Sequence, residues 1–210
     1  MGTKLLLVGG GGHCRSVLDS ILALQAYEEI GIIDPAGDSC LGIPVIGSDG
    51  DLPRLFREGW TGAVITVGSV GDTGTRRRLY AALKEIGFDL PVIIDPTAAV
   101  GNDVVIGEGT FVGKRAVVNT GSWIGVCAIV NTGAVIEHDC MIGDFSHVST
   151  GAILCGQVIA GKDVHIGAGS TVRQGIRIGD GTLAGAGSVI VKDLPREVKA
   201  YGNPCRVVEG

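Results

Sequence analysis

The sequence has few prolines, no surplus of positive charge and no long hydrophobic run. Glycine accounts for 36 of the 210 residues, but it does not recur at every third position and there are only 7 prolines, so collagen is excluded. Charged residues make up 19% and hydrophobic residues 45%, which argues against intrinsic disorder. The net charge is −5, and the one basic run, Arg76-Arg77-Arg78, is too short to indicate nucleic-acid binding.

The sequence also lacks a CxxC pair. Its six cysteines are irregularly spaced, so neither a metal site nor a thioredoxin-type site is expected. The apolar segment Lys4–Val8 runs directly into four glycines and is too short for a signal-peptide core or a membrane span. We therefore expect a soluble, cytoplasmic protein with reduced thiols, and neither nucleic acid nor a membrane among its partners.

A six-residue repeat begins at Ile94. From there to Ile190, every sixth residue is Ile, Val, Leu or Ala, seventeen times without an insertion. A small or apolar residue stands four positions after each of these, from Ala98 to Leu194. This period predicts short strands separated by turns, with a larger and a smaller side chain pointing inward, which is typical of a parallel β-helix. A solenoid that is only a scaffold is the alternative, but polar residues cluster at its outward positions.

Residues 1–93 lack this period and form a different unit. Strands are predicted at Lys4–Val8, Glu29–Asp34 and Gly62–Val67, helices around Val17–Leu22 and at Arg76–Ile86, and a last strand at Pro91–Ile94 that leads into the repeat. Alternating strands and helices predict a small, Rossmann-like parallel α/β sheet. We expect an α/β domain over 1–93, a β-helix over 94–194 and a C-terminal tail over 195–210.

Glycines and polar residues follow the predicted strands of this first domain. Gly9–Gly12 and His13 come after the first strand, Asp34 after the second and Gly68 after the third. Ligands of parallel sheets bind at these strand ends, and a glycine loop that opens a helix offers bare N–H groups to a diphosphate. Asp34 stands where an acidic side chain accepts from a ribose hydroxyl or a base N–H.

The dinucleotide-binding fingerprint is incomplete, because Cys14 occupies the position that requires Gly or Ala. The domain is also short for a full dinucleotide site. A mononucleotide-linked ligand is therefore expected, with a structural turn that binds nothing as the alternative.

Residues 18 positions apart are expected to stack, because three hexads complete one coil. His147 and His165 have this spacing, and so do Asn119 and Glu137. We expect the two histidines to stack on one outward face, with His165 a stacking partner that has no chemistry.

His138 lies between two carboxylates, Glu137 and Asp139. A neighbouring carboxylate orients an imidazole and raises its basicity, which suits a general base. An exposed turn residue without chemistry is the alternative. Cys140 occupies an inward position of the repeat and is expected in the core rather than as a nucleophile.

No metal is expected. The γ-class carbonic anhydrases bind zinc through three histidines on a β-helix, but two of their ligands stand five residues apart on one segment. This sequence lacks that spacing.

Three stretches resemble the NeuD/PglD/PerB-like family of sugar O- and N-acetyltransferases. The first is Asn131–Ala152, which contains the motifs Glu-His-Asp and Phe-Ser-His. The other two are Val8–His13, near the beginning of the sequence, and Tyr201–Arg206, near its end. The resemblance spans the whole chain and implies a left-handed β-helix, acetyl-CoA as co-substrate and a homotrimer that binds CoA between neighbouring solenoids. The handedness rests on the resemblance alone, since crossover connections are usually right-handed.

The resemblance implies roles for residues of the β-helix. His138 would be the general base and Asp139 would raise its basicity. His147 would contact acetyl-CoA near the thioester, and Ala168 and Ala186 would line the pantetheine path. A further glycine, Gly156, lies one coil beyond His138, where a side chain would intrude on the acetyl site.

The resemblance also implies a nucleotide-sugar site in the first domain. Gly11, Gly12 and His13 would hold the diphosphate and sugar, Asp34 would meet the nucleobase or ribose, and Gly68 would pack under the ligand. Pro35 stands where members that use UDP have a second acidic residue, so UDP, GDP and dTDP all stay open. Cys205 replaces the usual alanine of the tail, a change of little functional weight.

We therefore expect an enzyme of glycan biosynthesis that transfers acetyl from acetyl-CoA to an amine, the 4-amino group, of a nucleotide-linked deoxy sugar. The amine would attack the thioester directly, with His138 as base. The alternatives are O-acetylation of sialic acid or another sugar hydroxyl, and a non-catalytic nucleotide-sugar-binding protein.

Overall fold

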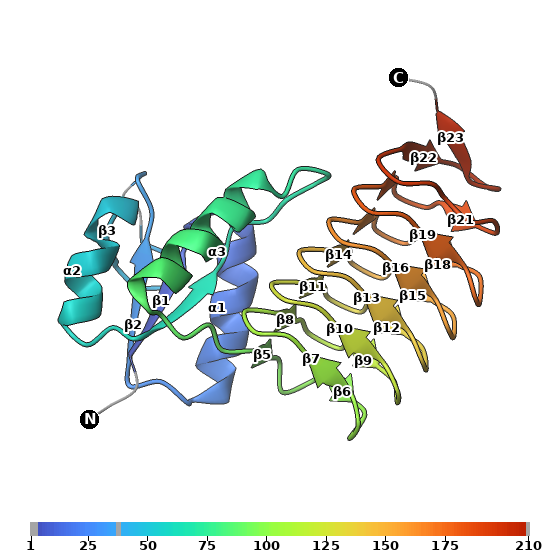
Figure 1. Ribbon diagram of the computed structural model, residues 1–210. Coiled ribbons are helices and arrows are strands. Elements are labelled where there is room, and N and C mark those ends of the chain that lie inside the picture. Colours follow the sequence, from blue (N-terminus) through green and yellow to red (C-terminus); the bar gives the residue numbers. More distant parts are fainter. Residues whose placement is uncertain (1–3, 37–38, 209–210) are drawn as a thin grey trace.

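The computed structural model describes residues 4–36 and 39–208, as an α/β part followed by a long β-helix (Figure 1). Four parallel strands form the sheet of the α/β part, in the order β3-β2-β1-β4. Its elements are β1 (Lys4–Val8), α1 (Gly12–Leu24), β2 (Glu29–Ile33), β3 (Val45–Gly47), the 3₁₀ turn η1 (Asp49–Asp51), α2 (Leu52–Arg57), β4 (Gly62–Ile65) and α3 (Gly74–Ile86). The predicted parallel α/β sheet is confirmed.

Helices cover both faces of this sheet. Leu5 and Leu7 of β1 pack in one buried cluster with α1, while Leu6 and Val8 pack in another with α2 and α3. Successive side chains of a strand point to opposite faces, so a strand covered on both sides needs an unbroken apolar run. The sequence of β1 is such a run, which is why the strand was predictable.

Several short elements were not predicted: β3, η1 and α2 in the α/β part, and two strands over Lys199–Tyr201 and Arg206–Val208 in the expected tail. β3 has three residues, and α2 has six residues with Pro53 in its first turn. Neither is long enough to show a period in the sequence. β2 and β4 also end slightly before the predicted positions, Asp34 and Val67.

The β-helix begins at β5, and each coil contributes one two-residue strand to each of three parallel sheets. Paired residues are 18 positions apart, as in Ile124↔Ile142 and Val130↔Val148. The strands are β5 (Ile93–Ile94), β6 (Ala99–Val100), β7 (Val105–Ile106), β8 (Phe111–Val112), β9 (Val117–Val118), β10 (Trp123–Ile124), β11 (Ile129–Val130), β12 (Val135–Ile136), β13 (Met141–Ile142), β14 (His147–Val148), β15 (Ile153–Leu154), β16 (Ile159–Ala160), β17 (His165–Ile166), β18 (Thr171–Val172), β19 (Arg177–Ile178), β20 (Leu183–Ala184) and β21 (Val189–Ile190).

The three sheets have five, six and eight strands. They run β19-β16-β13-β10-β7, β21-β18-β15-β12-β9-β6 and β23-β22-β20-β17-β14-β11-β8-β5. The last of these includes β22 (Lys199–Tyr201), parallel to β20, and β23 (Arg206–Val208), antiparallel to β22. Residues 199–208 therefore extend the eight-stranded sheet beyond the last hexad.

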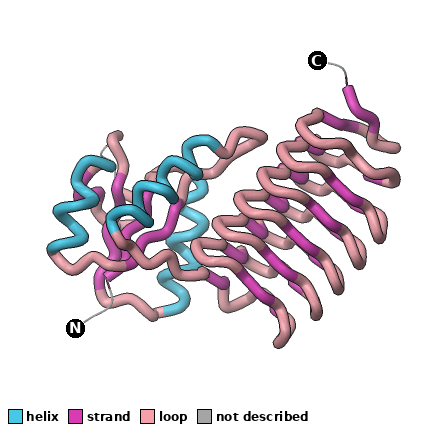
Figure 2. The backbone as a smooth tube through the Cα atoms, viewed as in Figure 1, coloured by secondary structure: helices cyan, strands magenta, loops and turns pink. Residues whose placement is uncertain are grey.

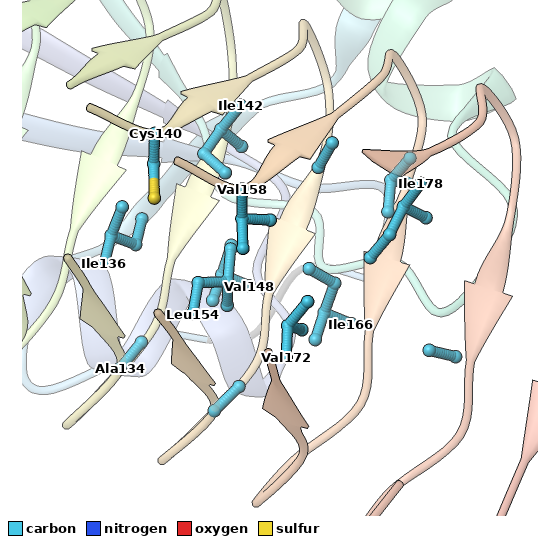
Figure 3. Packing of buried hydrophobic residues seen from close by; sticks show 14 of the residues in the cluster. Ala134, Ile136, Cys140, Ile142, Val148, Leu154, Val158, Ile166, Val172 and Ile178 are labelled. Atoms are coloured by element: carbon cyan, nitrogen blue, oxygen red, sulfur yellow. The ribbon is translucent and has the colours of Figure 1, made fainter. Parts of the chain in front are cut away.

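Both sets of repeat residues fill the interior of the β-helix (Figure 3). Ile136 and Ile142 of the larger set and Ala134 and Cys140 of the smaller set are completely buried. The inward positions predicted from the six-residue period are confirmed, and Cys140 lies in the core as expected.

Glycine serves two purposes in the coils. Gly133, at a corner, has φ of +64°, a conformation that a Cβ disfavours. Gly143 lies outside that region, but a Cβ there would run into the backbone of Gly161 in the next coil. Corner geometry and the close stacking of coils thus both select glycine.

The helices gather at the N-terminal end of the β-helix (Figure 2). Phe111 and Ile129 of the eight-stranded sheet join the buried cluster of α1, and Cys127 and Phe145 join the cluster of α2 and α3. The α/β part and the first coils therefore share two apolar cores.

Substituting an inward-pointing residue of a β-helix strand should destabilise the protein much more than substituting the outward-pointing residue beside it. Ile178 is 2% exposed, whereas Arg177 beside it points outward. We expect Ile178→Ala to lower the free energy of unfolding by about 2–4 kcal/mol through a cavity, and Arg177→Ala to change it by less than about 0.5 kcal/mol. Urea unfolding at one protein concentration measures both, and equal losses would contradict the inward assignment.

Candidate functional site

The glycine loop joins β1 to α1 and leaves backbone donors bare. Gly9 has φ of +112°, and Gly11 is the N-cap of α1 without a side-chain cap. Open space surrounds the Cα atoms of Gly11 and Gly12 where a side chain would stand. A helix N-terminus with free N–H groups and open space is suited to an anion such as a diphosphate.

Asp34 closes this loop rather than standing apart from it. Its Oδ2 accepts from the backbone N–H of Gly10 at 2.5 Å and its Oδ1 from that of Ala36 at 2.8 Å. Asp34 and Gly68 line a hollow of about 410 Å³ together with Gly9–His13, which we call the loop hollow. The structure thus brings together the five residues predicted for the nucleotide-sugar site.

His13 is enclosed and uncharged near neutral pH. Burial, and secondarily the Arg76 guanidinium, lower the pKa of His13 to about 4. Its ring meets Phe111 edge to face with centroids 5.6 Å apart, and a Cβ at Gly68 would lie 3.3 Å from its Cβ. Because His13 is neutral, the favourable charge at this hollow comes from the N-terminus of α1.

His147 is held at both ring nitrogens. Nδ1 lies 3.0 Å from the carbonyl oxygen of Ser69, and Nε2 lies 3.1 Å from Nδ2 of Asn131. A carbonyl only accepts, so Nδ1 carries the proton and Nε2 accepts from Asn131. Burial lowers the pKa of His147 to about 4, so the ring is neutral.

The predicted stacking of residues 18 apart is confirmed. His147 pairs with His165, and their rings meet edge to face with centroids 5.0 Å apart. Asn119 donates to Glu137 Oε2 at 3.0 Å.

A row of four adjoining hollows runs from the sheet edge to the late coils. Beside the loop hollow, the outer hollow, about 200 Å³, reaches Asp49 and Arg78. The junction hollow, about 530 Å³, reaches His147, and the coil hollow, about 430 Å³, contains Ala168 and Ala186. The outer and loop hollows share Gly9, Asp34 and Val67, the loop and junction hollows share Gly12, His13 and Gly68, and the junction and coil hollows share Val70, Asn131, His147 and Thr150.

His138 and Asp139 lie at a corner outside this row. His138 Nδ1 is 2.8 Å from Asp139 Oδ2, and the His138 side chain is 53% exposed. Asp139 has φ of +57°, the corner conformation that glycine adopts elsewhere. A Cβ at Gly156 would lie 2.5 Å from His138 Nε2, so Gly156 leaves room for the ring.

One chain does not bring the two parts of the predicted acetyl site together. His138 follows β12 of the six-stranded sheet and precedes β13 of the five-stranded sheet. In a coil with three sides, this corner is opposite the eight-stranded sheet that carries His147. His138, Asp139 and Gly156 therefore form one group, and His147, Ala168 and Ala186 another.

Sequence reasoning missed several residues that shape the row of hollows. Asn131 contacts Nε2 of His147, Ser69 and Val70 line the junction hollow, and Tyr201 lines the coil hollow. Counting residues in coils of 18 could have found Asn131, because it directly follows strand β11 of the eight-stranded sheet. The loop residues carry no periodic signal.

Two further findings concern the described residues, 4–36 and 39–208. Among them, three or more His, Cys, Asp or Glu side chains nowhere gather as a group that could hold a metal ion. Over the same ranges, every helix is too short or too polar to cross a membrane.

The chain matches two known domain families. The PglD N-terminal domain matches residues 4–83, and the GMPPB C-terminal domain matches residues 88–192. No curated protein sequence matches it.

Solved structures resemble the chain over its whole length. The acetyltransferase domain of PglB from Neisseria gonorrhoeae FA1090, in complex with acetyl coenzyme A, is 38% identical, with a TM-score of 0.93 over 99% of this chain and 100% of that one. PerB from Caulobacter crescentus, in complex with CoA and GDP-perosamine, is 37% identical, with a TM-score of 0.93 over 98% and 97%. WeeI from Acinetobacter baumannii AYE, 22% identical, shares the fold at a TM-score of 0.79 over 98% and 100%. The expected left-handed β-helix after an α/β domain is confirmed.

The buried neutral histidines should make stability depend on pH. The pKa values of His13 and His147 are about 4 when folded, below the usual value near 6.5, so the unfolded chain binds more protons between these values. Stability should be complete above about pH 6.5 and fall toward pH 4, by on the order of 3 kcal/mol per histidine.

His147→Asn should make this fall shallower, and the exposed change Arg57→Met should leave it as in the wild type. Urea midpoints measured from pH 8 to 4.5 test this. An unchanged slope in His147→Asn would contradict the neutral, buried state of His147.

Proposed function

The chain belongs to the NeuD/PglD/PerB-like family of sugar acetyltransferases, and on that premise we propose that it moves acetyl from acetyl-CoA to the 4-amino group of a nucleotide-linked deoxy sugar. It is a sugar N-acetyltransferase. PglB's domain was solved with acetyl coenzyme A, and PerB with CoA and a nucleotide-linked amino sugar. The observation that carries the proposal is the row of four adjoining hollows.

The order of the hollows matches the order of parts in two such substrates. The bare N–H groups of the loop hollow suit the diphosphate. The outer hollow, beyond Asp34, then takes the nucleobase and ribose, and the junction hollow takes the sugar. The coil hollow, with Ala168 and Ala186, takes the pantetheine arm, so the sugar amine and the thioester meet beside His147.

His138 acts as the general base in this proposal. Asp139 accepts from Nδ1–H at 2.8 Å, which leaves the lone pair of Nε2 free. Nε2 accepts a proton from the attacking amine, the new C–N bond forms, and the C–S bond breaks. The proton then passes to the CoA sulfur, and a backbone N–H of an adjacent coil stabilises the oxyanion.

A covalent acyl-enzyme is not needed. Cys140 is completely buried and burial raises the pKa of its thiol, so it is a poor nucleophile. Holding the amine and thioester together supplies much of the rate.

The separation of His138 from His147 supports an active site shared between copies in a homotrimer. The side chains that flank the His138 corner on its two sheets are apolar and exposed: Val105, Trp123, Met141 and Ile153. A second chain seated on this face covers them and brings its junction and coil hollows to His138.

The first test is turnover of the His138 variant. The wild type is assayed with acetyl-CoA against UDP-, GDP- and dTDP-linked 4-amino sugars and free sialic acid. With the best acceptor, His138→Asn should lower kcat by about 10²–10⁴-fold, the usual worth of a general base, and Cys155→Ala should keep full activity. Near-normal turnover of His138→Asn would refute the base, and transfer to sialic acid alone would refute the amino-sugar acceptor.

The second test asks whether one site uses two chains. Gly11→Asp fits the open space and adds a negative charge where the diphosphate binds, while His138→Asn removes the base. Each variant alone should be inactive. When the two variants are refolded together in equal amounts, half of the chains have an intact glycine loop and the other half have an intact His138. A site that takes its loop from one chain and its base from another then has both intact in about a quarter of cases, so about a quarter of wild-type activity should return. A mixture that stays inactive, although mass spectrometry shows mixed oligomers, rules out the shared site.

A further inference from the structure

We propose that Arg76 is a positioning residue that acts through Ser69 on His147, fixing which ring nitrogen of His147 carries the proton. The inference rests on the proposed function, since it gives His147 a place beside the thioester. Arg76 itself lies outside the four hollows.

Arg76 is a buried cation with unusual partners. It stands near the start of α3 and is 2% exposed. Its Nη1 donates to the carbonyl oxygen of Phe145 at 3.0 Å and to Ser69 Oγ at 3.1 Å, and its Nη2 donates to the carbonyl oxygen of Cys127. Within the described ranges it forms no ion pair, since Arg77 takes the nearby carboxylate of Asp163.

A buried guanidinium without a carboxylate is costly, and a neutral side chain could join two apolar surfaces more cheaply. Packing alone therefore does not explain why an arginine occupies position 76. Its planar group has several fixed donors, so it can hold corner carbonyls of two coils and a hydroxyl of the α/β part at the same time. No other side chain has that donor geometry.

Ser69 links Arg76 to His147 through two hydrogen bonds. The hydroxyl of Ser69 accepts from Arg76, while its carbonyl oxygen accepts from His147 Nδ1 at 3.0 Å. The segment is tied down again at Thr73, whose hydroxyl donates to Asp163 Oδ1 at 2.5 Å. Ser69 is thus fixed between α3 and the eight-stranded sheet.

The position of Ser69 has a chemical consequence. With Nδ1–H donated to a carbonyl, Nε2 of His147 carries the lone pair that accepts from Asn131, and both residues line the junction hollow and the coil hollow. If Ser69 shifts, the proton is free to move to Nε2 and the ring to turn. Neighbouring Val70, 75% exposed, lines both the junction hollow and the coil hollow and would shift with Ser69, which would change the shape of both.

The tautomer of His147 is the direct readout. In protein labelled with ¹⁵N-histidine, two-bond ¹H–¹⁵N spectra distinguish protonated Nδ1 from protonated Nε2. The wild type should show Nδ1–H for His147, assigned by its loss in His147→Asn. Arg76→Met and Ser69→Ala should give a mixture of tautomers, Arg76→Lys should restore Nδ1–H at least partly, and the exposed control Arg57→Met should match the wild type.

Kinetics supply a second readout. The KM for acetyl-CoA should rise about three- to tenfold in Ser69→Ala, the net worth of one ordinary hydrogen bond, with kcat changed less. Ser69→Ala keeps the carbonyl and disturbs only a hydroxyl, so it decides the question if Arg76→Met does not fold.

An unchanged tautomer and an unchanged KM in folded Arg76→Met or Ser69→Ala would overturn the proposal. The spectra need no turnover. If the wild type transfers acetyl to no sugar, the proposed function fails while the tautomer still decides the role of Arg76.

Discussion

Backbone hydrogen bonds between successive coils hold each side chain of the β-helix at a height and face set by its residue number. His147 N–H donates to Val164 at 2.8 Å, and Asp139 N–H donates to Thr120 at 3.0 Å. The same register therefore determines the positions of both groups of candidate site residues. It stacks His147 on His165 in the next coil, and it places His138 against Gly156 in the next coil. A slip of one residue would turn the aliphatic interior outward and separate these pairs together, so the core and the chemistry depend on the same register.

Besides the two shared apolar cores, one line of corners on the β-helix binds α3 of the α/β part through polar contacts. Cys127, Phe145 and Asp163 follow one another at 18-residue spacing with positive φ, a conformation that glycine adopts at corners such as Gly133 and Gly151. Arg76 binds the carbonyls of the first two, and Arg77 pairs with the carboxylate of the third. Cys127, Phe145 and Asp163 thus present their carbonyls or side chains to α3 from one side of the β-helix. This attachment sets the loop hollow beside the eight-stranded sheet.

Burial gives the histidines different properties although they belong to one chain. His13 and His147 are enclosed, so burial holds their pKa values at about 4 and they work as neutral, directional groups. His138 is 53% exposed at a corner, with one nitrogen paired to Asp139 and the other open. In the proposed function these properties are complementary: the neutral rings bind the ligands by directional hydrogen bonds, and the exposed ring of a second copy accepts the proton.

The sequence alone determined that residues 94–194 form a β-helix, although not its handedness, because an uninterrupted six-residue period buries its aliphatic residues in stacked coils, and the same counting stacked His147 on His165. It also determined the α/β sheet and the grouping of Gly11, His13 and Asp34, since parallel strands end at one edge. Only the tertiary structure decided the rest. The loop at Ser69 has no period, and the burial of Arg76, unlike its neighbours in the same basic run, arises from the docking of α3 on the coil corners, which local sequence does not encode.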